Sequence, residues 1–424
     1  MAMVEGKTEM DAMKSDIKII KKVYACLIAF YVNIPAINAI VTTISSAAAG
    51  VFMSFAYIFV VGCFCAAFLF QALTRPVKVY PTALMYILIP IFAFLLTFMI
   101  KPHSSVDIVF FALRVVFPLF FMSTCNFDER VFLKATMFIP IIGIFFVDKI
   151  FVRIQYDEVI SMGLTYAFLP VTIATVVYIA RYLGKIKGWS RIVDIIPITV
   201  NIVYGTNVIM YGSRGPILCI GLSIVFLLIS TCNKEKGGLV FKTGRTILFG
   251  IAVCLLIVYF LEILQAVQDL LNSHNLRFAF VDKILKLSEA GNLNNGRTEH
   301  YVAALSGIKK SPIWGNGVAM FEYNTGFVYP HNFLVQLFYD GGIILFSLVI
   351  IPLIVGMVKW VKNCTEPQYS MMIMLFFTAV PAALFSGELW TDYALWMTFG
   401  YIISFIRRGQ SAGNLQEEID CIKP

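Results

Sequence analysis

The sequence predicts an all-α polytopic membrane protein with one large extracytoplasmic loop. Of its 424 residues, 59% are hydrophobic and only 14% are charged, and the mean hydropathy is +0.83. Soluble domains carry about 25% charged residues, so this composition excludes a soluble globular chain. The apolar residues are also gathered into runs of about 17 to 25 residues, the length that an α-helix needs to cross a bilayer.

These apolar runs follow one another along the chain, which predicts about twelve transmembrane helices. We expect them at 23–41, 52–73, 82–100, 108–124, 131–147, 163–180, 194–211, 216–232, 246–264, 333–358, 369–385 and 391–406. No cleavage site follows the first run, so we expect the first helix to be retained. The predicted organisation is a cytoplasmic N-terminal segment 1–22, helices one to nine over 23–264, an extracytoplasmic catalytic loop 265–332, helices ten to twelve over 333–406, and a cytoplasmic tail 407–424.

The distribution of basic residues predicts the orientation. Most Lys and Arg residues of the short loops fall on the side that contains the N-terminus. The short connections on the other side hold only Lys101, Lys149, Arg153 and Arg214. Under the positive-inside rule both termini are therefore cytoplasmic. The net charge of +8 is then a topology signal, and its scattered basic residues do not indicate a nucleic-acid partner.

Cysteine and histidine usage indicates neither disulfides nor a metal. The nine cysteines lie in the predicted spans, at their inner ends or in cytoplasmic segments, so no outer disulfide is expected. All four histidines fall on the outer side, but they are scattered, and the chain contains no CxxC or HExxH motif. We therefore predict no metal and no cofactor.

The long polar stretch 294–342 carries the strongest candidates for chemistry. Arg297 begins a segment with helical spacing that Ser311-Pro312 ends, and an asparagine before it can cap the helix. A cation in a first turn opposes the helix dipole by about 0.3–1 kcal/mol, which is reasonable if an external anion lies between them. The alternative is an ordinary loop arginine. His331 directly precedes a span and is a candidate general base, or it merely caps that span.

Arg214 lies in the turn between two predicted spans. Glycines and Pro216 break the helix there, so Arg214 lies beside the N–H groups that begin the next helix, which outlines an anion site. The alternative is an interfacial arginine that caps a tight turn.

Further candidates for substrate binding are Arg114, Glu388, Asn332 and Trp314. Arg114 interrupts the span 108–124, so it faces the bundle or a wet cavity, or extends to the interface. Glu388 orients the histidine, or it is a solvated carboxylate. Asn332 adjoins the histidine, and Trp314 offers an aromatic face to a ligand or anchors the loop at the interface.

Taken together, these motifs resemble the O-antigen ligase and O-antigen polymerase superfamily of bacterial surface-polysaccharide enzymes. The resemblance covers about 205–350. It rests on the order of Ser213-Arg214-Gly215, Arg297, Ser311-Pro312 with Gly315-Asn316-Gly317, and His331-Asn332 with Gly342. It implies a GT-C-like architecture in the bacterial cytoplasmic membrane, with the active site on its extracytoplasmic face.

The resemblance implies a membrane glycosyltransferase that moves a glycan from an undecaprenyl-diphosphate donor to a sugar hydroxyl, with inversion and without a metal. Arg214 and Arg297 would stabilise the departing diphosphate, and His331 would accept the hydroxyl proton. Implied partners are the lipid-linked donor, a glycan or lipid-linked acceptor, the bilayer, a flippase and a chain-length regulator.

Two departures from the ligase pattern favour a polymerase. Leu345 stands where that pattern has Gly, Thr or Tyr, and only 33 residues separate Arg297 from His331. The alternative is an O-antigen ligase that transfers glycan to lipid A core or another anchor. An alternative of another class is a lipid-linked oligosaccharide transporter or flippase. Against it, the spans are nearly free of charge and show no internal repeat.

Overall fold

The computed structural model describes residues 2–45, 48–74, 81–100, 107–150, 158–211, 214–233, 235, 237–274, 279–291 and 296–422. It is 85% helical. Its contacts separate the chain into two compact units, each built from two stretches of sequence. Unit 1 consists of Met1–Lys78 and Cys125–Gly205, and unit 2 consists of Val79–Thr124 and Thr206–Pro424.

Unit 1 is a bundle of long helices around buried aromatic residues. Its elements are α1 (Ala2–Ile44), α2 (Ala48–Thr74), α6 (Glu129–Phe138), the 3-10 helix η2 (Ile139–Phe146), α8 (Glu158–Arg181), the 3-10 turn η3 (Leu183–Lys185) and most of α9 (Trp189–Tyr211). Pro140 has no N–H group, so the carbonyl of Thr136 lacks its usual helical donor. The buried Asn33 side chain donates to that carbonyl at 3.4 Å, and such pairing stabilises a polar group inside an apolar core.

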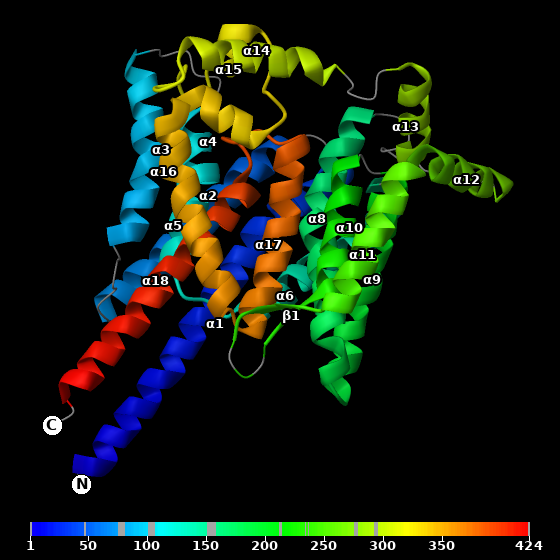
Figure 1. Cartoon of the computed structure of the whole chain (residues 1–424). Helices are drawn as coiled ribbons and strands as arrows, with labels where there is room; N and C mark the ends of the chain where they lie inside the picture. Colours follow the sequence, from blue (N-terminus) through cyan, green and yellow to red (C-terminus); the bar gives the residue numbers. More distant parts are fainter. Residues whose placement is uncertain are drawn as a thin grey trace. The chain divides into compact units, whose positions relative to one another are not determined.

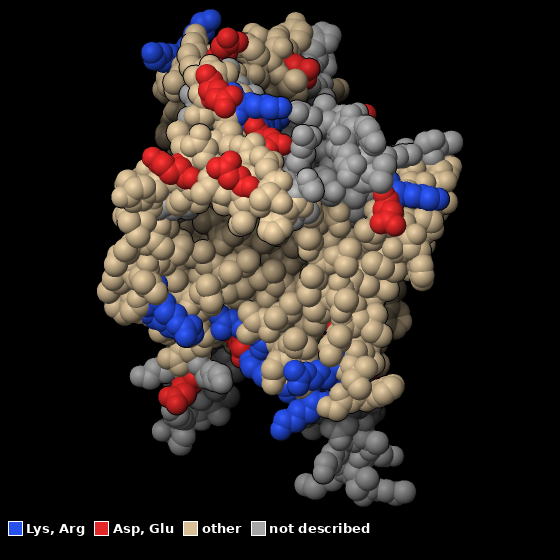
Figure 2. Space-filling view, turned by 90° about the vertical axis from the view of Figure 1, so that its right-hand side faces the viewer, with Lys and Arg blue, Asp and Glu red and all other residues tan. Residues whose placement is uncertain are grey.

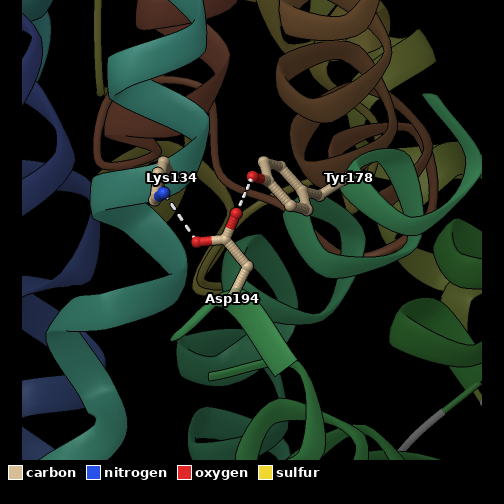
Figure 3. A network of polar contacts seen from close by, with 3 residues as sticks. All are labelled: Lys134, Tyr178 and Asp194. Atoms are coloured by element: carbon tan, nitrogen blue, oxygen red, sulfur yellow. Dashed lines mark hydrogen bonds and ion pairs between the residues drawn. The ribbon is translucent and has the colours of Figure 1, made fainter. Parts of the chain in front are cut away.

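A buried ion pair joins three helices of unit 1 (Figure 3). Asp194 of α9 is 0% exposed, and its Oδ1 lies 2.6 Å from Nζ of Lys134 on α6. The hydroxyl of Tyr178 on α8 donates to the other carboxylate oxygen at 2.6 Å. Because both oxygens have partners, the cost of burying this charge is offset within the bundle.

Unit 2 begins with α3 (Pro81–Ile100) and a helix in three parts, α4 (Ile108–Phe111), the π-helical turn η1 (Ala112–Val116) and α5 (Phe117–Thr124). After α10 (Arg214–Ile229), strands β1 (Ser230–Cys232) and β2 (Leu239–Phe241) form an antiparallel hairpin in which Thr231 pairs with Val240. The remaining elements are α11 (Thr243–Val258), α12 (Phe260–Ser273), α13 (Ala279–Glu289), α14 (Arg297–Lys310), α15 (Phe321–Thr325), α16 (Phe333–Asn363), α17 (Glu366–Phe385) and α18 (Tyr393–Ile422).

Within unit 2, the short helices α14 and α15 lie across the N-terminal end of α16 (Figure 1). A small cluster of Ala304, Phe321 and Tyr339 packs these three helices together. At Gly307 the helices are so close that a Cβ atom would lie 2.2 Å from the Tyr339 ring. The packing therefore holds α14, which begins at Arg297, at a defined place on the end of α16.

The expectation of an all-α polytopic membrane protein is confirmed. Eight helices of the described chain are long and apolar enough to cross a membrane: Asp16–Ile44, Val51–Thr74, Pro81–Ile100, Glu129–Ile150, Gly163–Lys185, Trp189–Met210, Phe333–Asn363 and Glu366–Phe385. On the face shown in Figure 2, much of the surface carries no charged side chain. Uncharged surface of this kind suits contact with lipid.

The remaining predicted spans differ from simple membrane helices. Ile108–Thr124 and Arg214–Ile229 are apolar helices but are shorter, and α18 continues through the predicted tail to Ile422. The predicted span 246–264 is broken within the described chain. The chain is helical to Val258 and then turns, so that Thr243–Leu255 and Phe260–Ser273 are bent by 83°. The helix α12 after the bend is amphipathic, which explains the turn, because its polar residues would be unfavourable in a hydrocarbon core.

Candidate functional site

The helix predicted to begin at Arg297 is present, but its cap differs from the prediction. Its N-cap is Gly296, with φ of 76°, and not an asparagine. The left-handed backbone at this position explains the glycine, and Asn294 and Asn295 lie outside the described residues. Among those residues, Arg297 makes no hydrogen bond or ion pair. Its charge is therefore available to a ligand.

The structure brings Arg214 near Arg297. Arg214 is the first residue of α10 and precedes the predicted span 216–232. Its pKa is lowered, first by burial and second by the positive charge of Arg297. Two like charges near each other in a partly buried place repel, and a bound anion would reduce this repulsion. The arrangement favours binding of a ligand with more than one negative charge.

His331 lies in the same electrostatic neighbourhood and has an unusual backbone. Its φ is 59°, which is rare for a residue other than glycine and indicates stored strain at a site. Burial, and after it the charges of Arg297 and His300, lower the pKa of His331 from 6.5 to about 4. The imidazole is therefore neutral at physiological pH. Its Nδ1 is buried and has no hydrogen-bond partner among the described residues.

Asn332 caps the helix that follows the histidine. Its side-chain oxygen accepts from the N–H groups of Leu334 at 3.0 Å and Val335 at 3.2 Å. Both contacts are those of an N-cap residue, which satisfies two of the free donors at the start of α16. Asn332 thus orients the backbone next to His331, and its contact with substrate stays a prediction.

Arg114 contacts the segment that carries Glu388, although the two residues lie far apart in the sequence. The segment 386–392 connects α17 to α18, and in it Thr391 donates to Glu388 Oε2 at 2.9 Å. Arg114 donates to the carbonyl of Thr391 at 3.4 Å, while its buried Nε has no hydrogen-bond partner among the described residues. Arg114 lies in the π-helical turn η1, a distortion that is frequent at functional sites.

Tyr329 connects this carboxylate to the arginine and histidine group. Its pKa is raised, first by burial and then by the charge of Glu388, while Arg297 lowers it. Its ring also lies edge to face against His331, with the centroids 4.4 Å apart. Burial raises the pKa of Glu388 as well, and the charge of Arg114 opposes that rise. Arg297 is thus linked to Arg214 and His331, and Tyr329 links Arg297 to Glu388, which in turn interacts with Arg114.

Two polar residues of α16 that our sequence reasoning missed hold the segment 386–392. Gln336 accepts from the N–H of Leu389 at 2.8 Å, and Asp340 accepts from the Trp390 indole at 2.5 Å. Asn332, Gln336 and Asp340 are spaced by four, so they share one face of the helix. This spacing in the sequence could have predicted a polar helix face that positions the segment of Glu388.

Trp314 lies apart from this charged group. It is 75% exposed and stands at the rim of an apolar groove of about 600 Å³ between α3 and α16. The loop that carries it is attached at both elements: the N–H of Val318 donates to Thr97 at 2.9 Å, and the N–H of Gly317 donates to the carbonyl of Asp340 at 2.9 Å. The groove is lined by residues of α3 that include Leu88 and Phe92 and by residues of α16 that include Ile344 and Leu348.

The glycines of the polar stretch allow this attachment. Gly342 has φ of 60° inside α16 and interrupts its helical backbone. A Cβ atom there would lie 2.2 Å from the carbonyl oxygen of Ile313, and one on Gly315 would lie 2.3 Å from that of Asp340. The motif around residues 311–317 therefore packs backbone to backbone against the kink in α16. Its role is to shape the groove and to place the loop.

His300 is a further member of the site that our sequence reasoning left unused. It lies three residues after Arg297 on α14, and its ring centroid is 4.9 Å from that of His331. Its Nδ1 is 2.9 Å from the carbonyl oxygen of Tyr329. A spacing of three residues puts His300 on the same helix face as Arg297, so the sequence could have indicated that His300 lies at the site. Within the described residues, no group of three or more His, Cys, Asp or Glu side chains is arranged to hold a metal ion.

The fold is that of a multi-pass membrane protein, and in unit 2 it places two arginines near two imidazoles. Comparison with protein families identifies the class further, because residues 199–350 match the family model described as O-antigen ligase. This stretch contains Arg214, Arg297 and His331, and it confirms the resemblance to the O-antigen ligase and polymerase superfamily. Members of this family are glycosyltransferase-like enzymes. No curated protein and no solved structure matches the chain at a significant level.

Proposed function

We propose that the protein is a polysaccharide polymerase that transfers glycan from an undecaprenyl-diphosphate donor to a sugar hydroxyl of an acceptor glycan. The observation that carries the proposal is the placement of Arg297 near both Arg214 and His331. The match of 199–350 to the O-antigen ligase family supports glycan transfer as the reaction class.

In this proposal the two arginines hold the diphosphate of the donor. The diphosphate leaves with additional negative charge when the glycosidic bond breaks, and that charge has to be stabilised in the transition state. Two guanidinium groups with several N–H donors suit its oxygens. Because they are placed before the substrate binds, little reorganisation is needed during the reaction. The charge that a divalent cation supplies in many other glycosyltransferases would here come from the side chains.

The acceptor hydroxyl then attacks the anomeric carbon from the side opposite to the diphosphate, which inverts the configuration. Its proton passes to an imidazole of the site, for which His331 is the residue predicted from the sequence. Glu388 accepts hydrogen bonds from acceptor or donor sugar hydroxyls, and Arg114 holds that carboxylate segment through Thr391.

The groove between α3 and α16 suits the hydrocarbon chain of the carrier. It is apolar, and Trp314 at its rim has the exposed aromatic face that packs on sugars or on lipid. Replacing Ile344 with Trp would fill part of the groove. We expect the KM for a long-chain donor to rise by about tenfold, with little change for a donor on a short prenyl chain, as expected from about 1.4 kcal/mol of lost apolar contact. An equal loss with both donors would contradict this use of the groove.

We further propose that the reaction takes place on the extracytoplasmic face of a bacterial cytoplasmic membrane, with both termini in the cytoplasm and about twelve spans in total. A flippase would deliver the donor to this face, and a chain-length regulator would limit the polymer. A ligase is the second candidate, because the family that matches is described as O-antigen ligase. Leu345 and the short distance of 33 residues between Arg297 and His331 favour the polymerase.

The test is a transfer assay with purified protein in detergent, a short undecaprenyl-diphosphate glycan and EDTA, with products separated by size. A ladder of lengthening glycans on the carrier is the expected result. Transfer that requires lipid A core or another added anchor would assign the ligase function instead. A protein that transfers to none of the acceptors, but moves the lipid-linked glycan across a vesicle membrane, would be a transporter.

A further inference from the structure

The helix α12 separates its side chains by polarity. Apolar residues spaced by three and four positions share one side of the helix and form what we call the apolar strip: Phe260, Ile263, Val267 and Leu270. Polar residues with the same spacing are exposed on another side: Glu262, Gln265, Asp269 and Asn272. One side of α12 therefore suits water, and the apolar strip needs an apolar partner.

The packing of α13 on α12 covers only part of this surface. Leu264 of α12 is buried in a cluster with Val281 and Ile284 of α13, and the Gln268 amide donates to the carboxylate of Asp282 at 3.0 Å. Within the described part of the chain, Ile263 remains 40% exposed and Leu270 remains 61% exposed. The contacts with α13 therefore do not account for the apolar strip.

The bend before α12 directs this helix along the membrane surface. The segments Thr243–Leu255 and Phe260–Ser273 are bent by 83°, and in Figure 1 α12 leaves the end of α11 sideways. The side chains of Leu248, Ile251 and Leu255 on α11 are apolar and exposed, as expected for a helix that contacts lipid. A helix nearly perpendicular to such a span lies in the plane of the membrane.

The length of α11 places the start of α12 at the boundary of the hydrocarbon core. Arg245 lies in the first turn of α11 and marks one membrane boundary. The 16 residues of α11 extend about 24 Å, whereas the core is about 30 Å thick. At Val258 the chain is thus about 6 Å short of the opposite boundary. Amphipathic helices that lie in the interface are buried to about this depth, about 5–10 Å.

We propose that α12 is an interfacial helix whose apolar strip is inserted among the acyl chains of the leaflet opposite to Arg245. Its polar side then faces water. The strip follows the lipid-facing surface of α11 directly along the chain, so the occupant is lipid and not a protein partner. This insertion would attach the segment between α11 and α14 to the membrane surface. The inference does not depend on glycan transfer.

The test measures the depth of single positions of α12. A fluorescent amino acid is incorporated at position 263, 265 or 270 of the full chain, which is reconstituted in vesicles of phosphatidylethanolamine and phosphatidylglycerol. At positions 263 and 270 we expect strong quenching by lipids with brominated acyl chains and protection from aqueous iodide. Position 265 is the matched control, since Gln265 is an exposed polar residue of the same helical turn as Ile263. There we expect iodide to quench and brominated lipids to have little effect.

A pair of charge substitutions sharpens the test. Ile263→Glu places a carboxylate in the apolar strip, where contact with acyl chains is unfavourable. With the probe at position 270, quenching by brominated lipids should then be lost. Gln265→Glu introduces the same side chain on the polar side and should retain the quenching. If Ile263→Glu aggregates, the comparison of probes at 263 and 265 in the otherwise unchanged chain decides the question.

Equal quenching by iodide at positions 263 and 265 would place the apolar strip in water and overturn the proposal. Protection of position 263 from both quenchers would overturn it as well, because protein would then cover the strip. If that protection disappears at a high ratio of lipid to protein, the covering protein is a second copy of this chain. None of these outcomes bears on glycan transfer, which the assay with the undecaprenyl-diphosphate donor tests separately.

Discussion

The polar groups of the two units are organised in opposite ways. In unit 1 the buried Asp194 is matched by Lys134 on one oxygen and Tyr178 on the other. In unit 2, Arg214 and Arg297 lie near each other, and His331 presents a buried nitrogen without a partner among the described residues. A polar network that only stabilises a fold satisfies its own members. The like charges of Arg214 and Arg297, which the fold holds near each other, fit the anionic ligand proposed above.

The largest effect that would test this comparison comes from Arg297→Ala. We expect the kcat/KM of transfer to fall by about 10²–10³-fold, as when one preorganised donor to a developing charge is removed. The melting temperature should stay close to that of the wild type, because Arg297 makes no hydrogen bond or ion pair with the described residues.

Lys309→Ala is the control for this variant, since Lys309 is an exposed residue in the last turn of the same helix. If Arg297→Ala transfers glycan at the full rate, Arg297 does not bind the diphosphate. The proposed difference between the polar groups of the two units would then be wrong.

Lys134→Met is expected to have a smaller effect, and this effect is on stability and not on transfer. It leaves the buried carboxylate of Asp194 without its cation. Breaking a fully buried pair costs about 3–5 kcal/mol, but Lys134 is 42% exposed, so we expect a loss of roughly 1–3 kcal/mol. The free energy of unfolding by denaturant measures this loss, and transfer per folded molecule should not change. Lys134→Met combined with Asp194→Asn should regain part of the stability. A loss of transfer at unchanged stability would show that unit 1 also contributes to chemistry.

The pH dependence of stability sharpens the account of His331. The pKa of His331 is lowered from 6.5 to about 4 in the folded protein. At a pH between these two values, His331 therefore binds a proton in the unfolded chain but not in the folded chain. Stability contributed by the neutral ring is therefore complete above about pH 6.5 and is lost as the pH falls toward 4. We expect the wild type to lose up to about 1 kcal/mol per pH unit in this window relative to His331→Gln. Parallel stability curves for the two proteins would contradict the burial of this ring.

The smallest effect is expected from Asn332→Ala. Removing the N-cap of α16 should destabilise the protein by about 1 kcal/mol, with a moderate decrease in kcat because the backbone at His331 is less well held. Asn332→Asp keeps an oxygen that accepts from Leu334 and Val335, so it should retain both stability and transfer. If Asn332→Asp is as inactive as a His331 variant, the asparagine amide contacts substrate and the prediction from the sequence is supported.

Much of the site was accessible from the sequence because its members adjoin structural signals. Arg214 follows a break between two apolar runs, Arg297 begins a segment of helical spacing, and His331 precedes a long apolar run. The helix at 297–310 ends at Ser311 as expected. The predicted asparagine cap was wrong, and the predicted span 246–264 is broken by a bend. In both cases a local conformation decided the outcome, the left-handed backbone at Gly296 and the turn after Val258.

The sequence by itself determined that this is a polytopic helical membrane protein, because hydrophobic length and charge asymmetry are sums over neighbouring residues and do not depend on packing. Only the tertiary structure decided that Arg114 meets the segment of Glu388, that Gln336 and Asp340 hold that segment, and that His300 lies beside His331. The physical reason is that these contacts join segments far apart in the chain. Their geometry follows from how helices pack and kink, as at Gly342, and no local pattern of residues records it.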